Sequence, residues 1–156
     1  MTFQILPLPA EPFEPLFGLT DDDLAQRGVH RVQVTSDFGF PCRISLEDAK
    51  TGQTVLLLNY EHLAIDSPYR SSHAIFVREG AVAAQVAPGQ IPASISSRLI
   101  SFRTFDEGGM MRDADVVDGS DLQPLLERAF ENPGVAFVHL HNARRGCFAA
   151  NVVRAD

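Results

Sequence analysis

The chain has few cysteines and no long hydrophobic run, and each shortage argues against a class of protein. Cys42 and Cys147 are its two cysteines, too few for the disulfide framework of small secreted domains. No apolar stretch approaches the roughly 18 residues that a membrane-spanning helix requires. The first residues lack a basic segment, and Pro7 and Pro9 interrupt their apolar run, which is not the pattern of a signal peptide. We therefore expect a cytoplasmic protein with free thiols and no membrane partner.

Basic residues are also scarce. The 156 residues include 13 basic side chains against 20 acidic ones, for a net charge of −7. This charge repels a phosphate backbone, so we expect no nucleic-acid partner. Lys50 is the only lysine, and the other basic residues are arginines, whose planar guanidinium groups suit bidentate binding of carboxylate or phosphate. The imbalance is compatible with a small anionic ligand, but a biased genome composition is the simpler explanation.

The rest of the composition is that of an ordinary globular protein. Hydrophobic residues make up 45% of the chain and charged residues 21%, which is the usual range. A chain of this length buries roughly 68–70% of its unfolded surface and needs no metal or disulfide to fold. We expect a single domain over residues 1–156 and assign no cofactor.

The apolar pattern predicts mostly β-strands. Alternation or short apolar runs indicate strands at residues 3–8, 30–35, 43–46, 54–60, 72–79, 99–105, 110–117, 135–142 and 147–154. Pro7 confines the first of these to a sheet edge. The run at 54–60 is apolar on both faces, as a central strand is. The DEGG sequence after Phe105 predicts a hairpin turn, and residues 80–92 predict a loop.

Two helices are predicted. The first begins at Thr20, whose hydroxyl can cap free N–H groups ahead of three aspartates, and ends at Gly28. The second has one apolar face at i, i+3, i+4, i+7 and i+8 from Leu122, with Ser120 or Asp118 as its cap and an end at residues 132–134. Hairpins interrupted by helices indicate an α+β fold: a largely antiparallel sheet, a C-terminal β-hairpin and two or three helices.

The C-terminal hairpin contains the densest group of reactive side chains, in the sequence FVHLHNARRGCF (137–148). His139 and His141 are two apart on a strand and therefore share a face. A three-residue loop with Gly146 in the left-handed conformation places Cys147 on that face, whereas a four-residue loop over 143–146 pairs Asn142 with Cys147 and reverses it. The sequence leaves both loops open.

Two interpretations of this hairpin follow. Two imidazoles and a thiolate on one face can bind zinc or activate the thiol as a nucleophile. Alternatively, the histidines are half-buried and hydrogen-bonded, and the cysteine is a small hydrophobic residue. Because paired CxxC spacings are absent, we assign no metal ligands and keep metal-dependent activity as a third hypothesis.

A second polar segment, SPYRSSH (67–73), offers a guanidinium and hydroxyl donors at the end of a strand. It suits the binding of an anion, and Glu61 or His62 just upstream can act as acid or base. The alternative is a solvated loop whose serines make local turns.

We predict that both segments form one His/Arg-lined pocket of an enzyme or a ligand-binding domain. The predicted ligand-binding residues are Tyr69, Arg70, Asn142 and Arg144. The predicted catalytic residues are His73, His139, His141 and, with the three-residue loop only, Cys147. The competing hypothesis is a non-catalytic interaction module or homodimer, in which these residues are ordinary surface.

Five segments carry a family resemblance: GFPCRISLEDA (39–49), VLLLNYEH (55–62), SPYRSSHAIFVRE (67–79), DADVVDG (113–119) and HNARRGCF (141–148). In this order and at this spacing, they resemble the bacterial family catalogued as domain-of-unknown-function 1203, over nearly the whole chain. The resemblance implies a bacterial protein of one domain. It implies no activity and no catalytic residues, since that family is uncharacterised.

Overall fold

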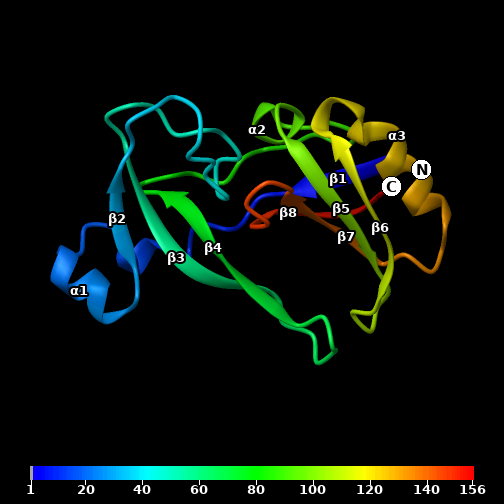
Figure 1. Cartoon of the computed structure of the whole chain (residues 1–156), viewed down its shortest axis with the longest axis horizontal. Coiled ribbons are helices and arrows are strands. Elements are labelled where there is room, and N and C mark those ends of the chain that lie inside the picture. Colours follow the sequence, from blue (N-terminus) through cyan, green and yellow to red (C-terminus); the bar gives the residue numbers. More distant parts are fainter. Residues whose placement is uncertain (1) are drawn as a thin grey trace.

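The fold is built around two antiparallel β-sheets, which a computed structural model describes over residues 2–156 (Figure 1). The larger sheet, in spatial order, contains β1 (Thr2–Leu6), β8 (Phe148–Ala155), β7 (Phe137–Asn142), β5 (Leu99–Phe105) and β6 (Met111–Asp118). The smaller sheet contains β2 (His30–Gln33), β3 (Thr54–Leu63) and β4 (Ser71–Arg78), with β3 in the centre. The predicted α+β class, the edge position of the first strand and the C-terminal hairpin are confirmed.

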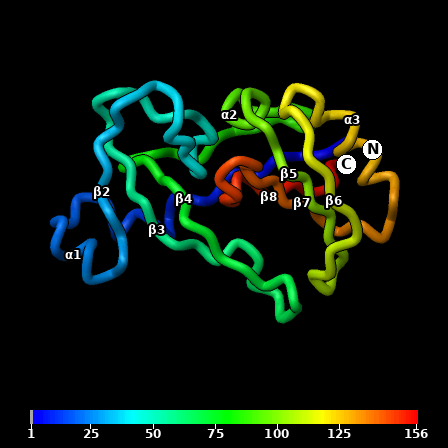
Figure 2. The backbone as a smooth tube through the Cα atoms, in the orientation of Figure 1, coloured from blue at the N-terminus to red at the C-terminus, as the bar shows by residue number. Residues whose placement is uncertain are grey.

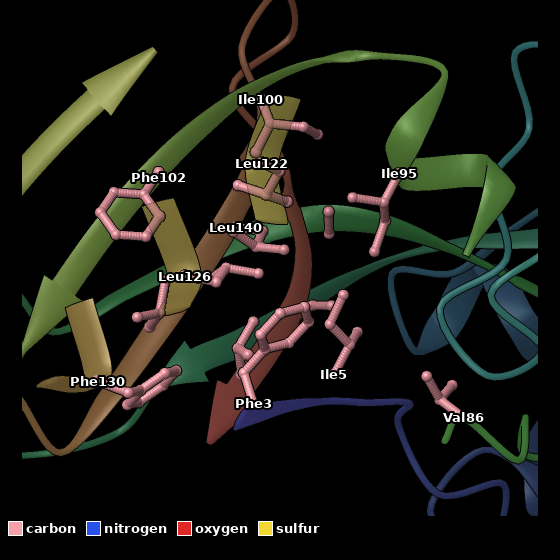
Figure 3. Close-up of a cluster of buried hydrophobic side chains, with 14 of the residues drawn as sticks. Phe3, Ile5, Val86, Ile95, Ile100, Phe102, Leu122, Leu126, Phe130 and Leu140 are labelled. Atoms are coloured by element: carbon pink, nitrogen blue, oxygen red, sulfur yellow. The ribbon is translucent and has the colours of Figure 1, made fainter. Parts of the chain in front are cut away.

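The two faces of the larger sheet differ because successive side chains on a strand point to opposite sides. One face is apolar and packs against the helix α3 (Leu122–Glu131). Figure 3 shows Leu126 and Phe130 of this helix among Phe3, Phe102 and Leu140 of the strands. The opposite face carries histidines and an arginine, and it is this polar face that bears on function.

The start of α3 differs from the prediction. A 3-10 turn, Gly119–Asp121, precedes the helix, so Asp121 occupies the N-cap position without a side-chain capping bond. The predicted caps, Ser120 or Asp118, are therefore wrong. The chain is tightly packed here: a Cβ at Gly119 would lie 2.1 Å from the carbonyl oxygen of Ile95. That close approach holds the turn against α2 (Ala93–Ser96), an element that the sequence did not predict.

The smaller sheet has its own apolar core, which includes Leu56, Leu58 and Ile75. The helix α1 (Asp21–Gln26) covers part of it, and its predicted cap is confirmed because the Asp23 amide donates to Thr20 Oγ1 at 3.1 Å. Phe148 of β8 belongs to the same core and is 2% exposed. The larger sheet thus joins the smaller one through a side chain at the start of its β8 strand.

The strand predicted at residues 43–46 is wrong. These residues form a turn, closed by the Leu46 amide donating to the Cys42 carbonyl at 3.0 Å, and isolated bridges flank it. Arg43 is the physical reason, because its guanidinium is buried and donates to the carbonyl oxygens of Phe148 (2.7 Å) and Pro41. Residues 80–92 form the predicted loop without helix or strand.

The tips of two hairpins meet at one end of the molecule. Ser67, in the β3–β4 turn, donates its hydroxyl to the carbonyl oxygen of Gly109, in the β5–β6 turn, at 2.9 Å. Figure 2 shows the two turns next to each other at the bottom of the view. Phe148 and this contact therefore join the polar face of the larger sheet to the smaller sheet at two places. Across residues 2–156, the structure contains no helix that is both long and apolar enough to cross a membrane.

Candidate functional site: a four-histidine cluster between the sheets

Two histidines reach the site from the smaller sheet. His73 lies directly opposite Tyr60 in the β3–β4 register, and both belong to the face that carries the apolar core. The register shifts between Glu61 and Leu63, which leaves His62 in a β-bulge. Bulges change the direction of a side chain and are common beside functional sites. Here the bulge brings the His62 ring against that of His73, with ring centroids 4.8 Å apart.

Two more histidines come from β7 of the larger sheet. His139 and His141 are 3% and 1% exposed and share the face away from α3, as their spacing predicts. In the β5–β7 register, His139 lies opposite Arg103 and His141 opposite Ser101. The polar face of the larger sheet therefore has imidazoles and a guanidinium on adjacent strands.

The four imidazoles contact one another. His62 Nε2 lies 2.7 Å from His73 Nδ1, and His62 Nδ1 lies 3.3 Å from His139 Nδ1. The His141 ring is 4.9 Å from that of His62 and 5.1 Å from that of His73, between centroids. One ring nitrogen from each of His62, His73 and His141 lies within 4.8 Å of the other two. Three nitrogen lone pairs can therefore converge on one point.

The cluster has an apolar side and a cationic side. Phe148 stacks on His62 with centroids 5.0 Å apart and an interplanar angle of 7°. On the other side, a terminal nitrogen of Arg103 lies 3.5 Å from His141 Nε2, and Arg103 Nε donates to Ser101 Oγ at 3.1 Å. His62 and His73 are half-buried, so the cluster opens to solvent beside these two rings.

The cluster contains no acidic partner within residues 2–156. The hydrogen-bonding groups around the four imidazoles are other imidazoles, the Ser71 hydroxyl, the Arg103 guanidinium and the Gly146 carbonyl. Glu61, the acidic neighbour of His62 in the chain, instead pairs with Arg70 on the surface at 3.2 Å. An arrangement in which a carboxylate orients a catalytic histidine is therefore not formed here among the described residues.

Burial keeps these imidazoles neutral. Burial is the largest cause and the nearby Arg103 cation a smaller one, and together with the neighbouring imidazoles they lower the pKa of His139 and of His141 to about 3 and that of His62 to about 4. The pKa of His73 is lowered by the same two causes. A neutral imidazole has one nitrogen with a free lone pair, which is the form that binds a metal ion or accepts a proton.

Hydrogen bonding fixes which ring nitrogen of His141 carries the proton. Its Nδ1 lies 2.9 Å from the carbonyl oxygen of Gly146. A carbonyl can only accept, so Nδ1 carries the proton and Nε2 has the lone pair. This unprotonated Nε2 faces a terminal nitrogen of Arg103 at 3.5 Å, and it belongs to the ring that stands beside both His62 and His73.

The structure brings together His73, His139 and His141 of the predicted catalytic residues, but not Cys147. Asn142 pairs with Cys147 through a backbone bond of 2.9 Å across a four-residue loop, and Gly146 adopts a φ of 80°. The thiol therefore lies on the opposite face, with its Sγ 3.2 Å from the buried Arg43 guanidinium. The condition for Cys147 as the nucleophile, a three-residue loop, is not met.

The predicted ligand-binding residues lie outside the cluster. Arg70 pairs with Glu61, and its side chain is 56% exposed. Tyr69 packs its ring against Phe105 with centroids 6.1 Å apart. Arg144 is exposed in the hairpin loop, and Asn142 contacts the Cys147 thiol at 3.6 Å.

Sequence reasoning missed Arg103 and gave His62 only a general role as acid or base. Arg103 had a detectable signal, because it is a charged residue between Phe102 and Thr104 in the middle of a predicted strand. A charge placed on an otherwise apolar strand is uncommon and points to a polar environment. His62 had no such signal, since its orientation depends on a bulge.

The fold and the cluster define an α+β domain with a group of histidines between two antiparallel sheets. The chain belongs to the family of proteins of unknown function DUF1203, whose sequence profile matches residues 39–154. That range contains all four histidines of the cluster and Arg103. Searches of curated proteins and of solved structures give no match.

Proposed function

We propose that this protein is a metal-dependent enzyme that binds a divalent transition metal, zinc in the first place, through His62, His73 and His141. The observation that carries the proposal is the convergence of one ring nitrogen from each residue to within 4.8 Å of the others. The three ligands come from β3, β4 and β7. They form no short sequence motif, so they could not be assigned as metal ligands from the sequence.

The separations of the nitrogens are close to those around such an ion, and the widest, up to 4.8 Å, has to shorten. Zinc–nitrogen bonds of about 2.0–2.1 Å in a tetrahedral arrangement separate the ligand nitrogens by about 3.3–3.4 Å. His62 Nε2 and His73 Nδ1, now 2.7 Å apart, need to separate by a fraction of an ångström to admit the ion. Three neutral imidazoles are ligands that suit zinc and the later divalent metals of the first transition row.

The groups around the ligands also suit a metal site. Histidine ligands usually donate their second ring N–H to a protein acceptor, which fixes the ring and its tautomer. His141 donates Nδ1–H to the Gly146 carbonyl. His62 has Nδ1 beside His139 Nδ1, so His139 can orient His62 without binding the ion itself.

Three protein ligands leave a coordination position free for water or a substrate, which is the arrangement of catalytic rather than structural zinc sites. A zinc ion in such a site supplies a bound water of lowered pKa and polarises an oxygen of the substrate. The half-buried rings of His62 and His73 lie on the side from which a substrate can reach the ion.

Zinc titration of metal-free protein, together with elemental analysis of the purified protein, tests the proposal. We expect binding of one zinc ion per chain. His62→Ala, His73→Ala and His141→Ala should each weaken zinc affinity by more than about 100-fold, and His139→Ala by about 10–100-fold as an orienting residue. His30→Ala is the matched control, because His30 is exposed on β2 and distant from the cluster in the fold.

The contrary result is equally clear. If the folded wild-type protein binds neither zinc, cobalt nor nickel in titration, and contains no transition metal when purified, the histidines serve only to pack the two sheets. In that case the alanine variants change stability but no ligand affinity, and the metal-dependent function is rejected.

A further inference from the structure

We propose that Arg103 and the open coordination position together bind a small oxyanion, a carboxylate or a phosphate, as the substrate class of this site. This inference rests on the proposed metal function. It assigns a role to Arg103, which is not one of the three proposed metal ligands and is not among the predicted ligand-binding residues.

Arg103 is held in place beside the ligands. It lies in the middle of β5, opposite His139 on one side and Ala114 on the other. Its Nε donates to Ser101 Oγ, which leaves the terminal nitrogens of the guanidinium facing the cluster, one of them 3.5 Å from His141 Nε2. That Nε2 is the unprotonated nitrogen, whose lone pair the metal ion would take in place of the Arg103 N–H, so Arg103 stands next to the proposed position of the metal ion.

Arg103 has no carboxylate partner in the described part of the chain, in contrast to four other arginines. Those four are Arg31, Arg70, Arg98 and Arg112, each paired with an acidic side chain. Asp113 and Asp115 on the adjacent strand lie opposite Thr104 and Phe102, so they belong to the other face of the sheet. The positive charge of Arg103 is therefore held half-buried without a protein counter-charge.

The charge of the occupied site favours the binding of an anion. A divalent ion held by three neutral imidazoles keeps its full charge, and Arg103 adds a further positive charge close to it. Like charges at short range in a partly desolvated site repel strongly. Many catalytic zinc sites reduce the charge with a carboxylate ligand. Within residues 2–156, however, no carboxylate side chain hydrogen-bonds to the cluster. An exogenous anion can supply the missing negative charge.

The geometry favours an oxyanion over a single-atom anion. Carboxylate and phosphate have two or more oxygens, one of which can bind the ion while another accepts from the guanidinium. A guanidinium binds such groups through its planar fork of N–H donors. The Ser71 hydroxyl, 3.2 Å from His62 Nε2, is a further donor at the solvent side of the site.

Cobalt-substituted protein provides the test, since the visible absorption of the ion reports on an added ligand. Inorganic phosphate and acetate are the two oxyanion probes, and imidazole is the neutral ligand that binds the metal without needing a positive charge beside it. We compare wild-type protein with Arg103→Gln and with Arg103→Lys. Arg112→Gln is the matched control, because it removes an arginine that is exposed and paired with Asp106.

We expect Arg103→Gln to raise the Kd of at least one oxyanion by about tenfold or more, with the Kd of imidazole unchanged. Arg103→Lys should restore part of the affinity, because it keeps the charge and loses the fork. Cobalt itself should bind the Arg103→Gln variant as tightly as, or more tightly than, the wild-type protein. Arg112→Gln should behave as wild type throughout.

The possible results distinguish a failure of the proposed oxyanion site from a failure of the proposed metal site. Equal oxyanion affinities in wild-type and Arg103→Gln proteins that both bind cobalt overturn the role of Arg103 and leave the metal site intact. If Arg103→Gln weakens the binding of imidazole and of the oxyanions equally, the substitution has damaged the metal site, and this result also overturns the inference. If the wild-type protein binds no cobalt, the metal function and this inference are rejected together. Comparison of the Kd for phosphate with the Kd for acetate indicates whether the substrate carries a phosphate or a carboxylate group.

Discussion

Lowering the pH should destabilise the metal-free protein through His139 and His141. Burial holds the pKa of each at about 3 in the folded protein, whereas a histidine in an unfolded chain has a pKa of about 6.5. Between these two values the unfolded chain binds more protons than the folded protein, so the free energy of unfolding rises with pH. Stability is therefore full above about pH 6.5 and is lost as the pH falls toward about 3.

The magnitude follows from the unfolded pKa. At pH 5 an unfolded histidine is almost fully protonated, whereas His139 and His141 remain neutral in the fold. This costs about 2 kcal/mol for each relative to pH 7, or about 4 kcal/mol for the pair. Typical domains have only about 5–15 kcal/mol of stability. Asp37 and Asp106, whose pKa values are lowered by hydrogen bonds, affect stability only below about pH 4.

Urea unfolding at pH 7, 6 and 5 in the presence of a chelator measures the loss. The double variant His139→Gln/His141→Gln keeps polar side chains that do not titrate, so its free energy of unfolding should fall by about 4 kcal/mol less than that of the wild type over this range. The loss that remains comes from His62, whose pKa is lowered to about 4. His30→Gln is the control, because His30 is exposed on β2 and lies outside the cluster.

The wild-type protein could instead lose less than about 1 kcal/mol between pH 7 and pH 5. That result would mean that the fold admits charged histidines in the cluster, and it would refute the reasoning from burial. A double variant with the same pH dependence as the wild type would refute the assignment to these two residues.

Two further substitutions test how the cluster is held. Phe148→Ala should lower the free energy of unfolding by about 3–5 kcal/mol in urea denaturation, because it opens a cavity beneath His62 where the two sheets join. A loss below about 1 kcal/mol would contradict this packing. Gly109→Val should cost about 1–2 kcal/mol by the same measurement, since Gly109 has a φ of 76° and its Cβ would lie 3.0 Å from Ile65. Gly108→Ala is its matched control, and an equal effect of the two substitutions contradicts the role of the hairpin contact.

Local patterns were sufficient for most elements of the fold. Thr20 caps α1 as its hydroxyl and the following acids predict, and the apolar face from Leu122 to Phe130 forms α3. The prediction failed at residues 43–46, where alternation suggested a strand. There a buried Arg43 donates to backbone carbonyls, one of them on distant β8, and the local pattern carries no information on that contact.

The site was only partly predictable. A period of two places His139 and His141 on one face whatever the loop, and the position of His73 on a strand was also readable. The face on which Cys147 lies was not predictable, because a loop longer by one residue reverses it. The structure has the four-residue loop. His62 joins the cluster through a bulge, which side-chain periodicity does not encode.

The sequence alone determined most of the strands, the two main helices and which histidines share a face, because these depend on neighbours a few residues apart. The tertiary structure decided that the histidines of β3 and β4 meet those of β7, and that Arg103 stands beside them without a carboxylate in the described residues. The physical reason is that this meeting depends on how two sheets pack around Phe148, and long-range packing is specified by many side chains together rather than by any local motif.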